Sequence, residues 1–257
     1  YKQENWQEAL KYFRQSYTYN PQINHGYIGA IMVHLKNFVS IDSVLYYKDL
    51  LLNKDIQNPR SYFDLGNVFL EYEWDSLALD YYNLAIHYDS LNTEYWNAKA
   101  HSLFKIGNKN KAIGTYRKSL QIDSSNSATY NALGVLYFKI ERYREALREF
   151  ENAIRHNPLN QLMYSNAGYT YYILKDYKNA EKYYLLAIEK DATIADNYYT
   201  LAQIYAETGE SSKALKALEN ALKLANYTRS AIEEDSAFQS IRTDKAFITL
   251  MEKYFNK

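Results

Sequence analysis

The chain has 257 residues but no cysteine, only three prolines and eight glycines, and its 30 basic residues balance 30 acidic ones. Without cysteine it can form neither a disulfide framework nor a thiolate metal site. So few helix-breaking residues exclude a fold of many short strands and favour long helices joined by tight connections. Zero net charge gives no overall attraction to nucleic acid or to an anionic membrane, so nucleic acid is not expected as a partner.

Long apolar runs are missing as well. The longest uncharged stretch, from Gln15 to Leu35, is interrupted by Asn20, Pro21 and Asn24. A membrane-spanning helix needs about 20 predominantly apolar residues in succession. Direct insertion of this chain into a membrane is therefore not expected.

Motifs of catalysis and cofactor binding are equally scarce. The sequence has no His-Glu-x-x-His zinc motif, no Gly-rich phosphate loop and no Gly-x-Ser-x-Gly nucleophile turn. Its five histidines are scattered along the chain. We therefore predict a protein that is not an enzyme and that has no catalytic residues, no cofactor and no metal ligands.

What the sequence does contain is a period of 34 residues. Six units follow one another at 25 to 58, 59 to 92, 93 to 126, 127 to 160, 161 to 194 and 195 to 228. Alignment of these units gives one column that is aromatic in five of six members and another that is alanine in five of six, and small residues recur where helices approach closely. The columns are Ile28, Tyr62, Trp96, Tyr130, Tyr164 and Tyr198, and Val44, Ala78, Ala112, Ala146, Ala180 and Ala214.

Within each unit the apolar residues recur at helical spacing in two blocks, which predicts a pair of helices. Gly107 and Gly209 fall between the blocks, where a left-handed helix end suits glycine. These columns resemble the tetratricopeptide repeat (TPR), whose pattern combines aromatic, Leu-Gly, Ala and Pro positions. In the unit 127 to 160 the matching residues are Tyr130, Leu133, Gly134, Tyr137, Ala146, Phe150, Ala153 and Pro158.

The resemblance implies an all-α solenoid of helical hairpins that stack into a right-handed superhelix from about residue 25 to 225. The unit 25 to 58 departs most from the pattern. Residues 1 to 23, with Trp6 and Phe13, look like the second helix of a unit whose first helix is absent. We therefore expect the natural protein to continue upstream, where a signal peptide, lipid anchor or further domain would lie, or another surface to cover this helix.

After Asn226 the period stops, and a solenoid needs an end cap. Residues 229 to 257 are predicted as a C-terminal helical cap. Its apolar residues lie at helical spacing: Phe238, Ile241, Phe247, Leu250, Met251 and Phe255.

In the TPR family the first helix of each hairpin lines a concave wall, so the resemblance implies which residues face a partner. The expected groove residues are Phe63, Asn67, Leu70, Asn97, His101, Phe104, Lys105, Asn131, Phe138, Lys139, Ser165, Tyr169, Tyr172, Ile173 and Tyr199. The same register places Leu162, Asp196, Gln203 and Glu207 at the wall. Phe104, Phe138 and Tyr172 hold one position in three successive repeats and predict an apolar stripe. Trp6 and Phe13 are a second candidate interface, at the end of the stack.

The resemblance implies a non-enzymatic scaffold or adaptor that binds a segment of a partner protein in this groove, within a multiprotein assembly. Two binding modes known in the family are not expected, because the Lys and Asn residues of a carboxylate clamp are absent and an asparagine ladder is matched only at Asn166. Two alternatives stay open. The first alternative to a scaffold is the repeat region of a larger enzyme or sensor whose active part precedes Tyr1. The second is a self-associating structural protein.

The location of the protein is indicated only by composition. The abundance of Tyr, Asn, Ile and Lys favours a low-GC bacterial source, in which many similar proteins are components of the cell envelope. We therefore expect a periplasmic or lipid-anchored protein, with the cytoplasm as the alternative.

Overall fold

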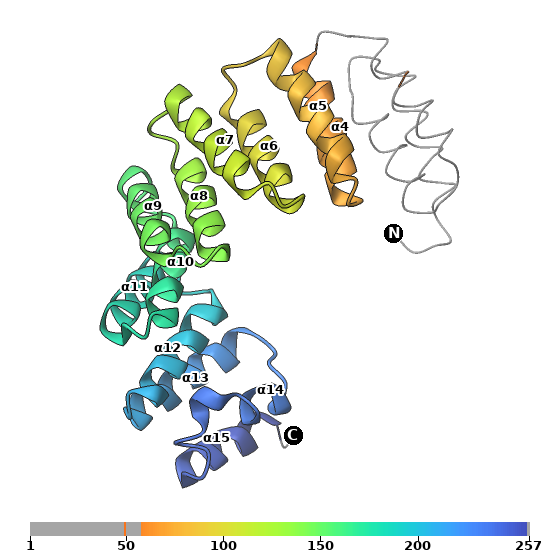
Figure 1. The fold of residues 1–257 in the computed structure, drawn as a ribbon. Coiled ribbons are helices and arrows are strands. Elements are labelled where there is room, and N and C mark those ends of the chain that lie inside the picture. Colours follow the sequence, from red (N-terminus) through yellow and green to blue (C-terminus); the bar gives the residue numbers. More distant parts are fainter. Residues whose placement is uncertain (1–48, 50–57, 256–257) are drawn as a thin grey trace, which may run out of the picture. The chain divides into compact units, whose positions relative to one another are not determined.

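The computed structural model describes Asp49 and residues 58–255 (Figure 1). All regular elements in this part of the chain are helices. The predicted all-α fold of paired helices is therefore confirmed there. The unit 1 to 23, with Trp6 and Phe13, and the unit 25 to 58, apart from Asp49 and Asn58, lie outside the described residues.

Ten of the helices form five antiparallel pairs. The first helices are α4 (Pro59–Glu71), α6 (Thr93–Lys105), α8 (Ser127–Lys139), α10 (Gln161–Ile173) and α12 (Ala195–Glu207). The second helices are α5 (Asp75–Tyr88), α7 (Lys109–Ile122), α9 (Tyr143–His156), α11 (Tyr177–Lys190) and α13 (Ser211–Leu224). Each first helix begins 34 residues after the preceding one, and so does each second helix. The chain forms two compact units, residues 1–124 and 125–257.

An asparagine precedes four of the five first helices. The side-chain oxygens of Asn58, Asn92, Asn126 and Asn160 each accept a hydrogen bond from a backbone N–H of the following turn, at 2.9 to 3.0 Å. Such a cap satisfies one of the N–H groups that have no partner inside the helix. Ile194 stands at this place before α12 and gives no such bond.

The turns inside the hairpins share one backbone conformation. Gly107 and Gly209 have φ angles of 85° and 79°, in the left-handed region predicted for them. Glu73, Glu141 and Lys175 occupy the same place in the other three hairpins and also have positive φ, between 58° and 62°. The geometry of the turn therefore persists where glycine is absent, although side chains other than glycine adopt it at some energetic cost.

Small residues let the two helices of a hairpin cross closely. A Cβ atom added to Gly134 on α8 would lie 2.6 Å from the ring of Phe150 on α9, and Gly66 has the same relation to Tyr82 at 2.5 Å. Substitution at either glycine would force a large ring to move. The alanines of the second-helix column are fully buried: Ala78, Ala112, Ala146, Ala180 and Ala214.

The core of the first unit is rich in aromatic rings. Phe69 stacks on Trp74 and Tyr81, with ring centroids 5.7 and 5.2 Å apart. At the next repeat, Trp96 donates a hydrogen bond from Nε1 to the carbonyl oxygen of Ser90 at 2.9 Å. Both tryptophans are thus held by contacts within this unit.

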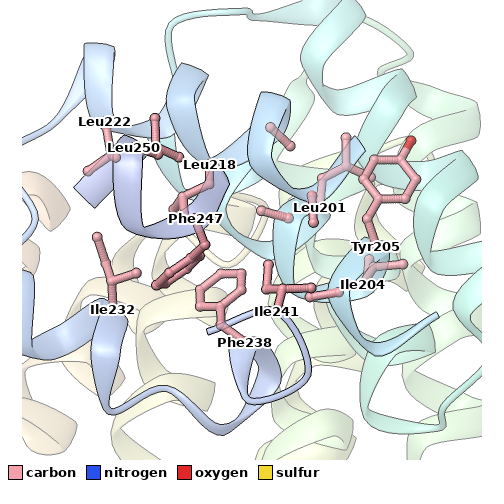
Figure 2. Packing of buried hydrophobic residues seen from close by; sticks show 14 of the residues in the cluster. Leu201, Ile204, Tyr205, Leu218, Leu222, Ile232, Phe238, Ile241, Phe247 and Leu250 are labelled. Atoms are coloured by element: carbon pink, nitrogen blue, oxygen red, sulfur yellow. The ribbon is translucent and has the colours of Figure 1, made fainter. Parts of the chain in front are cut away.

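The C-terminal end of the second unit is closed by α14 (Arg229–Glu233), a short 3-10 helix η2 (Ser236–Phe238) and α15 (Lys245–Phe255). Figure 2 shows the side chains of this cap packed on α12 and α13. Buried members from the cap and the last hairpin include Leu201, Ile204, Leu218, Leu222, Ile232, Phe238, Ile241, Phe247, Leu250 and Met251. The cap predicted for this end is therefore present.

Part of the cap is less helical than its spacing predicts. Phe238 ends the 3-10 helix and Ile241 lies in a turn. Asp235 accounts for the break, because its side chain accepts a hydrogen bond from the backbone N–H of Ala237 at 2.9 Å and its own carbonyl oxygen accepts one from Arg242. A new capped turn begins at Asp235 instead of a continued helix.

The crossing of α8 and α9 gives a test of this packing. Ala146→Leu should lower the free energy of unfolding by about 1 to 3 kcal/mol, because added methylene groups overpack a fully buried site. Thermal and urea unfolding would measure the change. The matched control is Gly114→Ala on α7, where an added Cβ meets no atom within 4 Å. It should not lower stability, and an unchanged midpoint for Ala146→Leu would contradict the packing.

Candidate functional site

In the first unit the expected groove residues divide into buried and exposed ones. Phe63 is only 4% exposed and packs against the rings of Tyr82 and Tyr95, at 5.7 and 4.9 Å. Its prediction as a groove residue is wrong, because the aromatic ring at this place in α4 joins the core. Asn67 is exposed, and its side-chain oxygen accepts a hydrogen bond from the Tyr82 hydroxyl at 2.8 Å.

Polar and apolar candidates of the first unit lie at the end of α4 and along α6. His101 and Lys105 are exposed, whereas Leu70, Asn97 and Phe104 are half-buried. The ammonium group of Lys105 lies 3.3 Å from a carboxylate oxygen of Asp75 on α5. This ion pair holds the lysine against its neighbouring hairpin.

In the second unit three rings from two first helices form a row, which we call the aromatic row: Phe138, Tyr169 and Tyr172. The centroids of Phe138 and Tyr169 are 5.5 Å apart, and those of Tyr169 and Tyr172 are 6.3 Å apart. Tyr143 and Tyr177 continue it at its two ends, at 5.4 and 6.1 Å. Two members of the predicted stripe, Phe138 and Tyr172, are thus brought together through Tyr169.

The aromatic row is open to solvent on one side. Tyr169 is 44% exposed, and Ile173 and Leu162 on the same helix are 39% and 48% exposed. The opposite face of α10 is buried through Met163, Ala167 and Gly168 among others. One helix thus presents apolar side chains to the core and to the outside.

Asn131 and Ser165, two polar residues expected in the groove, are hydrogen-bonded to side chains of the neighbouring first helices. Asn166 donates a hydrogen bond from Nδ2 to Oδ1 of Asn131 at 2.8 Å. Ser165 donates to Oδ1 of Asn197 at 2.6 Å, and Asn197 in turn donates to Gln161. These bonds cross-link α8 to α10 and α10 to α12. They position the first helices side by side.

Tyrosine hydroxyls pair with carboxylates at the edge of this surface. Tyr172 donates to Glu207 at 3.2 Å and Tyr227 donates to Asp196 at 2.8 Å. Asp235 accepts from both the Tyr199 hydroxyl and the Gln203 amide, each at 2.8 Å. These contacts run from α10 across α12 to the cap.

Sequence reasoning placed Tyr199 at the wall but missed Tyr227 and Asp235. Tyr227 stacks on Tyr199 with the ring centroids 4.9 Å apart. Both missed residues follow the last helix of the repeats, so a register that ends at α13 assigns them no position. Their only signal was that polar and aromatic residues occur together just after the period stops.

Burial raises the pKa of Tyr172, Tyr199 and Tyr227, and the carboxylate that each one faces raises it further. A phenolate in these places would lose solvation and would be repelled by the carboxylate. The three hydroxyls therefore stay protonated and act as donors through the physiological pH range.

Three further features of the described residues concern metal ligands, membrane spans and surface depressions. Residues 58–255 contain no group of three potential metal ligands. No helix in that region is both long and apolar enough to span a bilayer. A shallow depression on α11 lies on the face opposite the buried Ala180 and Tyr184, and it is lined by Lys178, Glu181, Lys182, Leu185, Leu186 and Glu189.

Models of a known repeat family match three segments of the chain. One model of the tetratricopeptide repeat matches residues 131–194, and another matches residues 93–126 and 195–228. Together these segments cover just over half of the chain. No curated protein sequence matches.

Solved structures share the fold at low sequence identity. MamA from Desulfovibrio magneticus RS-1 is 16% identical with a TM-score of 0.57, over 65% of this chain and 94% of that one. YrrB, a TPR protein with an unusual peptide-binding site, is 19% identical with a TM-score of 0.55, over 73% and 96%. Pseudomonas aeruginosa pilF is 19% identical with a TM-score of 0.62, over 86% and 97%.

The buried tyrosines predict a loss of stability in alkali. Burial raises the pKa of Tyr116 and Tyr183 from 10.0 to about 12. In the unfolded chain these groups ionise near 10.0, so the unfolded state loses protons first and folding is destabilised as pH rises from 10 toward 12.

Ionisation of the buried Tyr116 should cost up to about 1.4 kcal/mol per pH unit in that range, and ionisation of the half-buried Tyr183 should cost less. Urea unfolding at a series of pH values would measure the slope. Tyr116→Phe has no group to ionise and should reduce the slope. A slope that is unaffected by this change would contradict the burial of the Tyr116 hydroxyl.

Proposed function

Because the chain belongs to the tetratricopeptide repeat family, we propose that it is a non-enzymatic scaffold whose first helices bind a segment of a partner protein. Repeats of this kind form protein-interaction scaffolds. We further propose that the units of 34 residues are the building blocks of this scaffold, and that the protein acts within a multiprotein assembly.

The observation that carries the proposal is the exposed face of α10. This helix has no charged residue from Gln161 to Ile173, yet one of its faces is open to solvent. A surface helix normally carries charged and polar residues on its outer face. Contiguous exposed apolar surface is typical of an interaction site.

The aromatic row suits this role. Tyrosine and phenylalanine lose little rotamer entropy on binding and bury a large area, so they are common anchors at interfaces. The amide cross-links between α8, α10 and α12 hold the rings in place before a partner arrives, which lowers the entropic cost of binding.

The carboxylate clamp and the asparagine ladder, which the sequence does not favour, are not part of this proposal. The Asn166 amide donates a hydrogen bond to Asn131 on the neighbouring helix α8 at 2.8 Å, so it already binds within the protein. We therefore propose that side-chain contacts with the aromatic row, and not a ladder of amides, hold the partner. Self-association of the chain as a structural protein is the competing function.

Removal of the row should abolish binding. Phe138→Ala combined with Tyr172→Ala should eliminate capture of the native partner in a pull-down, with the helical circular dichroism nearly unchanged. A second pair, Tyr169→Ala with Ile173→Ala, changes only exposed side chains and should do the same. The matched control is Leu159→Ala with Leu185→Ala, which removes exposed apolar side chains elsewhere.

Three results would redirect the proposal. Undiminished capture by both groove pairs would move the binding surface elsewhere, with Trp6 and Phe13 as the next candidates. A large fall in melting temperature for Tyr169→Ala with Ile173→Ala would assign these side chains to the core. Equal loss for the control pair would mean that binding follows general exposed apolar area.

A further inference from the structure

We propose that the segment bound by the second unit is basic, with lysine or arginine side chains that lie over the aromatic row and pair with Glu207 and Asp196. This inference rests on the proposed function, because it specifies the chemistry of the partner for the same surface.

Charge is distributed unevenly between the two sets of helices in this unit. The first helices α8, α10 and α12 together carry one basic residue, Lys139, and two acidic ones, Asp196 and Glu207. The second helices α9, α11 and α13 carry nine basic and six acidic residues. The set that presents the aromatic row is therefore the acidic one.

The carboxylates at this surface accept hydrogen bonds from tyrosine hydroxyls. Elsewhere in the unit several carboxylates form ion pairs with lysine or arginine. Glu207 accepts from Tyr172, and Asp196 accepts from Tyr227. Within the described residues neither carboxylate lies in an ion pair with a lysine or arginine. Both residues are exposed, so each keeps an open side for an incoming cation.

Asp235 adds to the negative charge near the cap. Its carboxylate accepts from Tyr199 and Gln203, while Arg242 donates to its backbone carbonyl oxygen. Asp235 also caps the 3-10 helix. Asp235 therefore contributes to the negative electrostatic potential of this surface, whereas Glu207 and Asp196 are placed to bind the lysine or arginine side chains of the partner.

The rings give the second argument. Elsewhere in the unit the cations of the chain lie over aromatic faces, with Arg142 over Tyr137 at 4.8 Å and Lys213 over Tyr205 at 5.0 Å. Lys182 lies over Tyr183 and Lys253 over Tyr254 in the same way. In the described part of the chain no cation of its own covers the aromatic row. The partly exposed ring of Tyr169 is thus an open acceptor for a cation–π contact.

Charge also favours a basic segment over the other molecules that could bind this surface. An acidic segment or a nucleic acid would bring like charge against Glu207 and Asp196. A second copy of this chain would have to use its second helices, but several of their cations are already paired with their own carboxylates. Those pairs are Arg148 with Glu149, Lys190 with Glu189, Lys213 with Glu210 and Lys223 with Glu219.

The test is selection of a phage-displayed random peptide library against the full chain. Enriched peptides should be rich in lysine and arginine. The affinity of a synthetic copy of one enriched peptide should fall about tenfold or more for Glu207→Gln with Asp196→Asn, because hydrogen bonds between charged groups are lost. It should also fall at high salt. Glu189→Gln on α11 removes one negative charge away from the surface and should leave the affinity unaltered.

The outcomes separate this inference from the proposed function. Enriched peptides that are neutral or acidic, but that lose binding with Tyr169→Ala and Ile173→Ala, would overturn the basic partner and keep the groove. Basic peptides whose affinity is unaffected by Glu207→Gln with Asp196→Asn would overturn it too. Failure to enrich any peptide, or enrichment indifferent to the Tyr169 and Ile173 pair, would contradict the proposed function itself.

Discussion

Close contact between a residue without a large side chain on one helix and an aromatic ring on the other is the interaction on which each hairpin depends. Gly134 against Phe150 and Gly66 against Tyr82 leave no room for a Cβ atom. The contact fixes the crossing of the two helices, and the crossing fixes which residues of the first helix remain on the surface. The aromatic row of Phe138, Tyr169 and Tyr172 is exposed because other positions on the same helices fill the interior.

Tyrosine serves both sides of this arrangement, and the chain has 29 of them. Its ring fills a core or stacks on a neighbour, and its hydroxyl must then find an acceptor where the ring reaches the edge. At the end of the second unit the acceptors are carboxylates: Tyr199 meets Asp235 and Tyr227 meets Asp196. The need to satisfy buried rings therefore gives this surface its acidic character.

The sequence predicted the hairpins well because each depends on columns that recur in register, such as the buried alanines at Ala146 and its equivalents. It failed at Phe63, because a column that is polar in Asn97 and Asn131 does not reveal that a ring at the same place joins the core. It did not reveal that Asn131 and Ser165 are already bonded to Asn166 and Asn197. Such pairings depend on the distance between neighbouring helices, which a single repeat does not encode. Beyond Asn226 no register existed to place Tyr227.

The tryptophans divide between the two compact units in an uneven way. Trp6, Trp74 and Trp96 all fall within residues 1–124, and residues 125–257 have none. Trp74 stacks on Phe69 and Trp96 is bonded to Ser90, so both indoles sense local order. Indole fluorescence is thus a natural reporter of the first unit alone, while helical ellipticity follows both. The difference between the two signals distinguishes independent from concerted unfolding without any introduced label.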